Sequence, residues 1–369
     1  MESMDENGNT RKARRVTSLL PPLPRMRRAL SNRSTNSGVS ARVQYPIPDF
    51  DKRVYPKVDY EIAGWEHWSE DVIGILHTSE RTSWRALAGT AVSTPVTQAH
   101  RSTLTDWLVQ VDSHLKLLPE TFHRCVQLCD RYTHEQPVSL RQYQLIGVVS
   151  LWIACKVEER YVPEIKELIE LTDDSYTIDE ALMCERRMLR VVDFRLQTPT
   201  AVLWARFLID HYLRCIPSLV CTVDPSLDAI RRRRVLTHRV FFLLDLFTII
   251  DPIVQRHRPS LVATALIALM LHAENVEWPA DLSALTGYSA HDVRPVQQQI
   301  CAVVVRFNKY SADEKNRAKL LASAHMKGVY DKHARSRYGQ VSTQDWMRHE
   351  VFERLAAPPQ NVDMEISLL

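Results

Sequence analysis

The chain of 369 residues is long enough for two domains with flanking tails, and its 45% hydrophobic and 25% charged residues are typical of a folded globular protein. Only nine residues are glycine, which favours helices over many tight β-turns, and the net charge is +3. The longest apolar run, near residues 261–271, is too short to span a bilayer, so no membrane contact is expected.

The first 58 residues differ in composition from the rest of the chain. Pro, Ser, Arg and Asn dominate there, no helical period persists, and nine Lys or Arg but no acidic residue lie between positions 7 and 48. We therefore expect residues 1–58 to form a disordered basic tail. Such a tail can bind nucleic acid, direct import into the nucleus, or present a peptide motif to a partner.

Three amphipathic helices are expected after the tail. Residues 65–76, 101–111 and 117–132 each place apolar side chains three, four or seven positions apart, which predicts helices that pack into a bundle. Pro119 fits the first turn of the third helix, where the missing N–H has no partner to lose.

The central stretch, residues 144–160, begins as an apolar helix and ends in charge. Lys156 lies three residues after Ile153, so its ammonium group is expected on an apolar face. A helix over residues 178–192 places Glu185 in an apolar stripe in the same way. Two such charges of opposite sign form an internal salt bridge, extend towards solvent, or meet a partner protein. The pattern alone leaves these alternatives open.

The same stretch carries a family resemblance. Gly147, Ala154-x-Lys156, Glu158-Glu159, Pro163-Glu164 and the run 171–173 stand as they do in the signature of the cyclin box, so the segment resembles the cyclin family. The resemblance implies binding to a cyclin-dependent protein kinase, with Lys156 and Glu185 at the positions of the pair that grips the kinase. The other kinase contacts that it implies are Ile153, Leu189, Phe194, Leu196, Trp68 and Val72.

The helix around residue 104 resembles the one on which cyclins dock substrate peptides that contain Arg-x-Leu. The groove that this resemblance implies is formed by Leu104, Trp107, Gln110 and Gln144. Three apolar residues of the family pattern are replaced by His100, Thr103 and Tyr143. Because a fully buried apolar side chain is worth about 1.5–3 kcal/mol, we expect the groove to be weakened or altered.

The second half of the chain contains a weak internal repeat. Residues 145–154 of the first bundle align with residues 259–268 when they are shifted by 114 positions, and the apolar pattern is kept. At the same shift the Lys156 and Glu185 positions become Met270 and Gln299. A duplicated bundle with these charges in only one copy indicates that they serve function rather than folding.

Other segments of the second half resemble B-type cyclins in particular. These segments are residues 286–295 and 329–342. The run Arg231–Arg234 stands at the start of a predicted helix, where acidic residues would be preferred. We expect it to be a solvated face, or else a site for an anion or a phosphopeptide.

The sequence RRALSNRST in the basic tail resembles a cyclin destruction box. Arg27, Ala29, Leu30 and Asn32 match the pattern, whereas Thr35 stands where a later Asn belongs. In an unfolded segment, an Arg and a Leu three residues apart can reach an acidic and an apolar pocket of a ligase. The resemblance implies recognition by the anaphase-promoting ubiquitin ligase.

Motifs of catalysis do not occur in the sequence: there is no phosphate-binding loop, kinase motif, nucleophile elbow or Cys/His metal spacing. We therefore expect a regulator without a cofactor rather than an enzyme, and the near-neutral body gives no reason to expect nucleic acid as a partner. The fold hypothesis is all-α, with two tandem cyclin-type helical bundles at 59–197 and 198–356, a disordered basic N-terminal tail at 1–58 and a loose tail at 357–369.

The functional hypothesis follows from the resemblance to G2/mitotic B-type cyclins. Such a protein binds and activates a cyclin-dependent kinase for G2/M progression, occupies nucleus and cytoplasm, and is degraded by ubiquitination at mitotic exit. The alternatives are an A-type, S-phase cyclin, and a cyclin-fold transcription factor or scaffold that activates no kinase.

Overall fold

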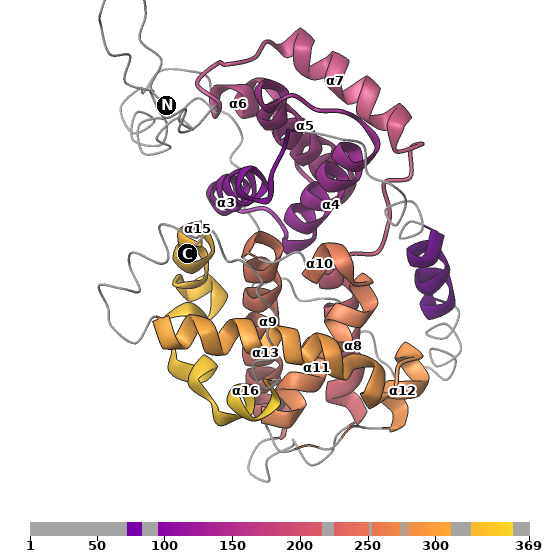
Figure 1. The fold of residues 1–369 in the computed structure, drawn as a ribbon, viewed down its shortest axis with the longest axis vertical. Coiled ribbons are helices and arrows are strands. Elements are labelled where there is room, and N and C mark those ends of the chain that lie inside the picture. Colours follow the sequence, from indigo (N-terminus) through magenta and orange to yellow (C-terminus); the bar gives the residue numbers. More distant parts are fainter. Residues whose placement is uncertain are drawn as a thin grey trace, which may run out of the picture.

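The structure is a computed structural model that describes residues 72–82, 95–215, 225–250, 253–273, 276, 278, 280–310 and 326–356. The destruction-box-like motif and Trp68 lie outside the described residues. Every regular element within these ranges is a helix, and the helices form two bundles, one above the other in the view of Figure 1. The prediction of an all-α chain with two tandem bundles is confirmed.

The first bundle surrounds one buried central helix. Its helices are α3 (Gln98–Leu115), α4 (Pro119–Glu135), α5 (Leu140–Glu158), α6 (Ile165–Glu170) and α7 (Ile178–Val191). The apolar stripe of α5 is buried, as its spacing predicts. Gly147 lets α3 approach closely, because a Cβ atom at this position would lie 2.9 Å from Cδ1 of Leu104.

The starts of α6 and α7 are set by the residues just before them. Helix α6 begins at Ile165 after Glu164 as its N-cap. Helix α7 is capped by Thr177. The Thr177 side chain accepts from the Glu180 N–H while the Glu180 carboxylate accepts from the Thr177 N–H, so each side chain satisfies a backbone donor.

The second bundle repeats this arrangement around α11. Its described elements are α8 (Ala201–Cys215), α9 (Pro225–Ile250), α10 (Ile253–Arg256), α11 (Pro259–Ala273), α12 (Ala280–Thr286), α13 (Ala290–Tyr310), α15 (Lys327–His333) and α16 (Glu350–Leu355), with three short 3-10 turns between α15 and α16. Helix α11 covers the segment that the internal repeat matches to α5, and it is buried on nearly all sides. Arg231–Arg234 lie within α9 and not at its start.

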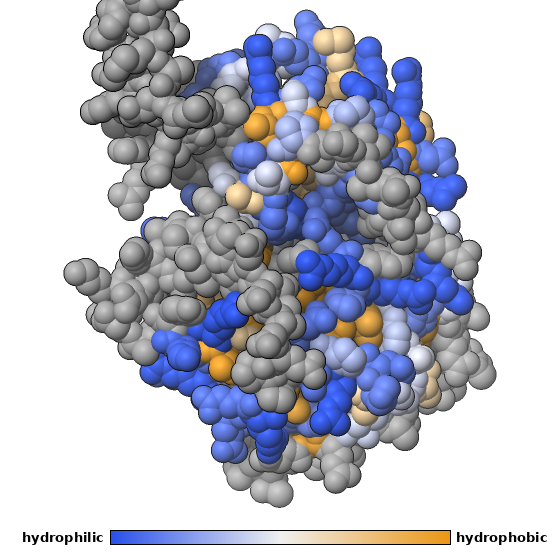
Figure 2. Space-filling view, viewed as in Figure 1, coloured by the Kyte–Doolittle hydropathy of each residue, from blue (hydrophilic) through white to orange (hydrophobic). Residues whose placement is uncertain are grey.

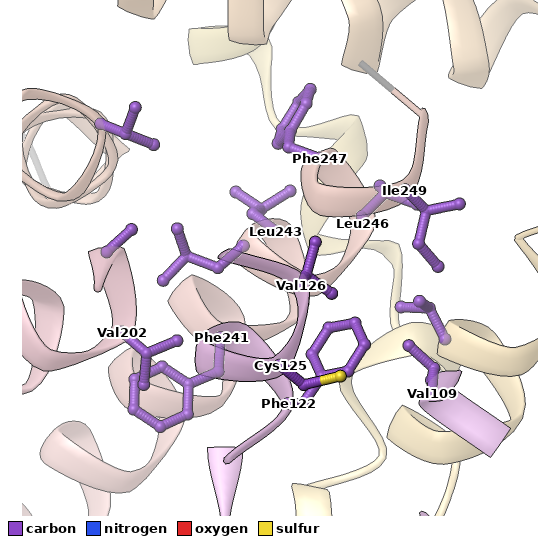
Figure 3. Packing of buried hydrophobic residues seen from close by; sticks show 14 of the residues in the cluster. Val109, Phe122, Cys125, Val126, Val202, Phe241, Leu243, Leu246, Phe247 and Ile249 are labelled. Atoms are coloured by element: carbon purple, nitrogen blue, oxygen red, sulfur yellow. The ribbon is translucent and has the colours of Figure 1, made fainter. Parts of the chain in front are cut away.

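The two bundles share one hydrophobic core. Figure 3 shows Val109 of α3, Phe122 and Val126 of α4, Val202 of α8 and Leu246 of α9 within one cluster. All of these side chains are buried. Because burial of an apolar side chain of this kind contributes about 1.5–3 kcal/mol, the shared core opposes separation of the bundles.

Polar contacts also cross between the bundles. The Arg101 guanidinium binds both carboxylate oxygens of Asp130 at 2.8 Å, and its Nη1 donates to the Thr248 carbonyl oxygen at 2.7 Å. The Ser102 hydroxyl donates to the carbonyl oxygen of Ile249 at 2.8 Å. The beginning of α3 therefore satisfies carbonyl groups near the end of α9, which an α-helix leaves without intrahelical partners.

A buried group of charged side chains, here called the interbundle charge cluster, joins α3, α4, α9 and α15. It consists of Asp112, His123, Asp245, Lys332 and His333. Lys332 Nζ lies 2.9 Å from Asp112 Oδ2 and 2.7 Å from Asp245 Oδ2. Nε2 of each histidine lies 2.8 Å from an Asp245 carboxylate oxygen. Sequence patterns gave no sign of this cluster, because Asp245 lies 122 residues from His123 and 87 residues from Lys332 in the chain.

Charge pairing dominates the titration of this cluster. Burial opposes the charged forms of Asp245 and Lys332, but the opposite charges nearby hold the pKa of Asp245 well below its usual value and raise that of Lys332. Burial raises the pKa of Asp112 to about 6 despite its contact with Lys332, and it lowers the pKa of His333. At pH 7 the cluster therefore holds two carboxylates, one ammonium group and a neutral His333.

Among the described residues, no helix combines the length and the apolar character that crossing a membrane requires.

Candidate protein-binding site

The predicted ion pair forms at the surface of the first bundle. Lys156 lies in the last turn of α5, and its Nζ is 2.5 Å from Glu185 Oε1 in the middle of α7. Nζ is also 3.2 Å from the centre of the Trp152 ring, which gives a cation–π contact. The Lys156 side chain is 39% exposed and that of Glu185 is 13% exposed. Of the alternatives left open by the sequence, the structure therefore shows an ion pair between Lys156 and Glu185, with the Lys156 side chain extending towards solvent along the Trp152 ring.

Packing between α5 and α7 fixes the two ends of this pair. Ala181 and Met188 are the buried residues of α7, and Ser150 of α5 contacts the Met188 sulfur at 3.5 Å. The capping box at Thr177 sets where α7 begins. Glu185 is thus placed opposite Lys156 by local sequence and by the buried face of α7.

An exposed aromatic side chain follows α7. Phe194 is 67% exposed, and both it and Asp193 have left-handed backbone conformations with φ of 53° and 52°. The Phe194 N–H donates to the Leu189 carbonyl oxygen at 2.9 Å, which closes the turn. Non-glycine residues rarely adopt such backbone angles, so the surrounding structure must hold this turn in place.

Two buried arginines of α4 hold the segment after α7. Arg131 Nη2 donates to the Val192 carbonyl oxygen at 2.9 Å and its Nη1 to that of Arg195 at 3.1 Å. Arg124 donates to the carbonyl oxygens of Leu196 and Thr198, and its Nε contacts Glu158 of α5. These contacts explain why Phe194 points outward. Sequence analysis missed both arginines, because each serves backbone groups more than sixty residues away.

The other predicted apolar contacts fall into different environments. Ile153 is only 1% exposed and belongs to the core, so the structure does not support a direct contact between its side chain and a partner. Leu189 and Leu196 are half-buried. Val72 is 44% exposed.

Additional apolar side chains on the first bundle are exposed, and sequence analysis did not single them out. They are Tyr161 and Val162 after α5, and Ile178 and Met183 on α7. Figure 2 shows apolar residues among hydrophilic ones on this part of the surface. Because these residues share the α5–α7 region with the Lys156–Glu185 pair, the region combines charge with apolar area, as protein interfaces do.

The helix at residues 72–82 lies apart from the first bundle. In Figure 1 it runs beside α8 and α12 of the second bundle. The His77 and Trp204 rings have centroids 4.7 Å apart, and the Glu80 carboxylate contacts Ser260 of α11. Val72 and Ile75 are on the opposite, exposed side of the helix.

The residues of the expected docking groove are mostly covered. Leu104, Trp107 and Gln144 are buried, and Gln110 is half-buried with its Nε2 donating to Asp106 Oδ2 at 3.0 Å. Trp107 Nε1 and Gln144 Nε2 are buried donors without a hydrogen-bond partner. The structure thus brings the four predicted groove residues to α3 and the adjacent part of α5, with two donors unsatisfied.

Within the described residues, no group of three or more His, Cys, Asp or Glu side chains has an arrangement that fits a metal ion. The free cysteines described there are buried or half-buried, and burial raises the pKa of Cys184 to about 11.

Two stacked helical bundles are the fold that the resemblance to cyclins implies. Family models for the cyclin N-terminal domain and the cyclin C-terminal domain match residues 71–197 and 208–345. The chain belongs to the cyclin family, as the resemblance at the central helix predicts.

The similar curated proteins are B-type cyclins. The chain is 29% identical to the G2/mitotic-specific cyclin-B2 of Anguilla japonica and 30% identical to that of Rana japonica, with 71% of this chain and 59% of each relative covered. It is 31% identical to the G2/mitotic-specific cyclin-B of Patella vulgata, with 57% of this chain and 47% of the relative covered. The chain thus spans less than two thirds of the length of these relatives. Among solved structures, a viral cyclin from herpesvirus saimiri is 18% identical with a TM-score of 0.46, covering 62% of this chain and 96% of that one.

Proposed function

We propose that this protein is a regulatory subunit that binds and activates a cyclin-dependent kinase during G2/M. The observation that carries the proposal is the surface ion pair of Lys156 and Glu185, together with exposed Phe194 after the end of α7. The names of the B-type relatives support the same function and its place in mitosis.

The geometry of the pair suits a kinase backbone. An ammonium group with 39% of its side chain exposed retains donors for carbonyl oxygens, and the neighbouring carboxylate accepts from backbone N–H groups. Because α5 and α7 hold the two groups in place, little conformational entropy is lost when a partner binds. Phe194 adds an apolar anchor of the type that dominates interface energies.

The proposed activation acts on the position of the kinase's regulatory helix. A kinase is active when its Lys–Glu ion pair and its metal-binding Asp are both in place, and these depend on the position of its regulatory helix. A rigid α5–α7 surface pressed against that helix stabilises the active arrangement and orders the activation loop. No catalytic group of this chain takes part in phosphoryl transfer in this proposal.

Regulated destruction is part of the same proposal. The destruction-box-like residues Arg27, Ala29, Leu30 and Asn32 suit recognition by the anaphase-promoting ubiquitin ligase, and the basic tail suits presence in nucleus and cytoplasm. The test is the half-life of the full chain in extract from cells leaving mitosis. Substitution of Arg27 and Leu30 by alanine is expected to prolong that half-life.

A weakened Arg-x-Leu docking groove is proposed on α3. Trp107 Nε1 and Gln144 Nε2 are buried donors without partners, and their burial keeps them from the carbonyl oxygens of a docked peptide. The burial of Leu104 and the replacement of apolar groove residues by His100 and Thr103 support weak binding. An A-type cyclin would instead bind such peptides strongly, so titration with an Arg-x-Leu peptide separates the two alternatives.

The experiment that tests kinase binding compares three full-length proteins by calorimetry with a purified cyclin-dependent kinase catalytic subunit. They are the wild type, Lys156→Ala and, as a matched control, Lys309→Ala, which removes an exposed lysine of α13 in the second bundle. The proposal predicts binding by the wild type and the control, and binding at least about tenfold weaker for Lys156→Ala. A wild type that binds no such kinase would support the scaffold or transcription-factor alternative.

A further inference from the structure

The helix at residues 72–82 has two unlike faces. Ile73, His77 and Glu80, spaced four and three residues apart, face the second bundle. Val72 and Ile75 face solvent and are 44% and 67% exposed. An isolated helix of this length is barely stable in water, so its contacts with the second bundle decide whether the apolar pair is presented in a fixed place.

Glu80 makes the most specific of these contacts. Its side chain is buried, and its carboxylate accepts from the Ser260 N–H at 2.6 Å and from the Ser260 hydroxyl at 2.5 Å. Ser260 is the second residue of α11, so its N–H is one of the donors that a helix leaves unpaired at its N-terminal end. The carboxylate of one helix therefore caps the central helix of the second bundle, where the helix dipole also favours a negative charge.

The surroundings of Glu80 complete a polar attachment. The Tyr288 hydroxyl lies 2.8 Å from Ser260 Oγ. Burial raises the pKa of Glu80, while its hydrogen bonds from Ser260 and the positive charge of Arg258 favour the carboxylate. Both residues belong to the second bundle, as does Trp204, which contacts His77. Because hydrogen bonds to a buried carboxylate depend on direction more than apolar contacts do, they fix the rotation of the helix as well as its place.

We propose that Glu80 is a positioning residue: by capping α11 it holds helix 72–82 in the one rotation that presents Val72 and Ile75 to a bound kinase. This inference rests on the proposed function, since it names the kinase as the partner of the exposed pair. It adds to that function a residue that touches no partner and yet sets how firmly the helix is held for binding.

The test uses the full chain in four forms: wild type, Glu80→Ala, Ser260→Ala, and the control Thr78→Ala. Thr78 is an exposed residue of the same helix whose hydroxyl bonds only within the helix, to the Gly74 carbonyl oxygen. Ser260→Ala is a smaller change than Glu80→Ala, since it removes the hydroxyl donor and leaves the N–H. Hydrogen exchange of residues 72–82 and the Kd for a purified cyclin-dependent kinase catalytic subunit are measured for each form.

In Glu80→Ala, hydrogen exchange should be faster over residues 72–82 and unchanged in α5. The Kd for the kinase should be about tenfold higher, which is the effect of a helix that occupies its binding-competent position only about a tenth of the time. Ser260→Ala shifts both measurements in the same direction by less, and Thr78→Ala shifts neither. In a Val72→Ala, Ile75→Ala background, the addition of Glu80→Ala should leave the Kd unchanged, because the helix then has no apolar pair to present. A purely structural role of Glu80 would raise the Kd in this background too.

Two outcomes overturn the inference in different ways. If the wild type binds the kinase and Glu80→Ala binds equally well, the positioning role is wrong while the proposed function stands. If the wild type does not bind the kinase at all, the proposed function fails, and the role of Glu80 in kinase binding fails with it. Exchange data then still decide whether Glu80 holds the helix.

Discussion

Lys332→Met is the substitution that most directly probes how the two bundles are held together. Lys332 is 2% exposed and its ammonium group lies within 3 Å of carboxylates from both bundles, 2.9 Å from Asp112 and 2.7 Å from Asp245. Methionine nearly keeps the length of the side chain, so the change removes charge rather than volume. Two buried carboxylates are left without their cation.

The magnitude follows from the cost of breaking a buried ion pair. Removal of one partner costs about 3–5 kcal/mol, because an uncompensated charge stays buried. This is a large part of a total stability that is about 5–15 kcal/mol for ordinary domains. Second-site change of Asp112 to asparagine in the Lys332→Met protein should recover part of the loss, because it removes one of the two unpaired carboxylates.

The assay is urea denaturation of the full chain at pH 7.5, followed by circular dichroism. The matched control is Lys309→Met on α13, an exposed lysine whose loss should change the unfolding free energy by no more than about 0.5 kcal/mol. A loss below about 1 kcal/mol for Lys332→Met would refute the argument, since a lysine truly buried between two carboxylates cannot be removed so cheaply.

Three further predictions concern the site and the effect of pH. Lys156→Ala and Glu185→Ala should each lower the unfolding free energy by only about 0–1 kcal/mol in the same denaturation assay, because the ion pair is partly solvated. A loss above about 3 kcal/mol, as expected for a buried pair, would contradict the surface position of the pair. Phe194→Ala should leave stability within about 0.5 kcal/mol and raise the kinase Kd about tenfold in calorimetry, since its ring is exposed; an unchanged Kd would remove Phe194 from the site. Burial lowers the pKa of His333, so below pH 6.5 the unfolded chain gains a proton that the folded protein does not. The destabilisation caused by His333→Gln should therefore shrink between pH 7 and 5.5, by up to about 1.4 kcal/mol for each pH unit below 6.5. Equal destabilisation at pH 7 and pH 5.5 would contradict the lowered pKa.

The helical periods predicted the fold well because apolar spacing reflects burial directly. The buried residues of α5 and α11 lie where the stripes and the internal repeat indicate. Helix ends were less predictable. Thr177 and Glu180 form a capping box, whereas Asp173 and Asp174, whose residue type is also common at N-caps, adopt positive φ in the turn before α7.

For the candidate site, the sequence indicated which residues to consider but not the environment of each side chain. Spacing placed Lys156 on an apolar face, yet the side chain is long enough to leave that face along Trp152 and reach Glu185 at the surface. Ile153 shows the opposite case, since its neighbours in space bury its side chain in the core.

Contacts between distant segments could not be inferred from one sequence. Arg131 serves carbonyl groups after α7, and Glu80 caps a helix 180 residues away. The interbundle charge cluster likewise has no spacing that marks it. Its members are ordinary charged residues until the fold brings four helices together.

Kinase activation is the measurement that tests the central claim most directly. The rate at which a purified cyclin-dependent kinase phosphorylates a peptide substrate is measured alone, with the wild-type chain, and with Lys156→Ala, Glu185→Ala. The account predicts that the wild type raises the rate well over tenfold, a change of more than about 1.4 kcal/mol in the activation barrier, and that the folded double variant loses this effect at the same concentration. A wild-type chain that binds the kinase without raising its rate, or a double variant that activates as well as the wild type, would contradict it.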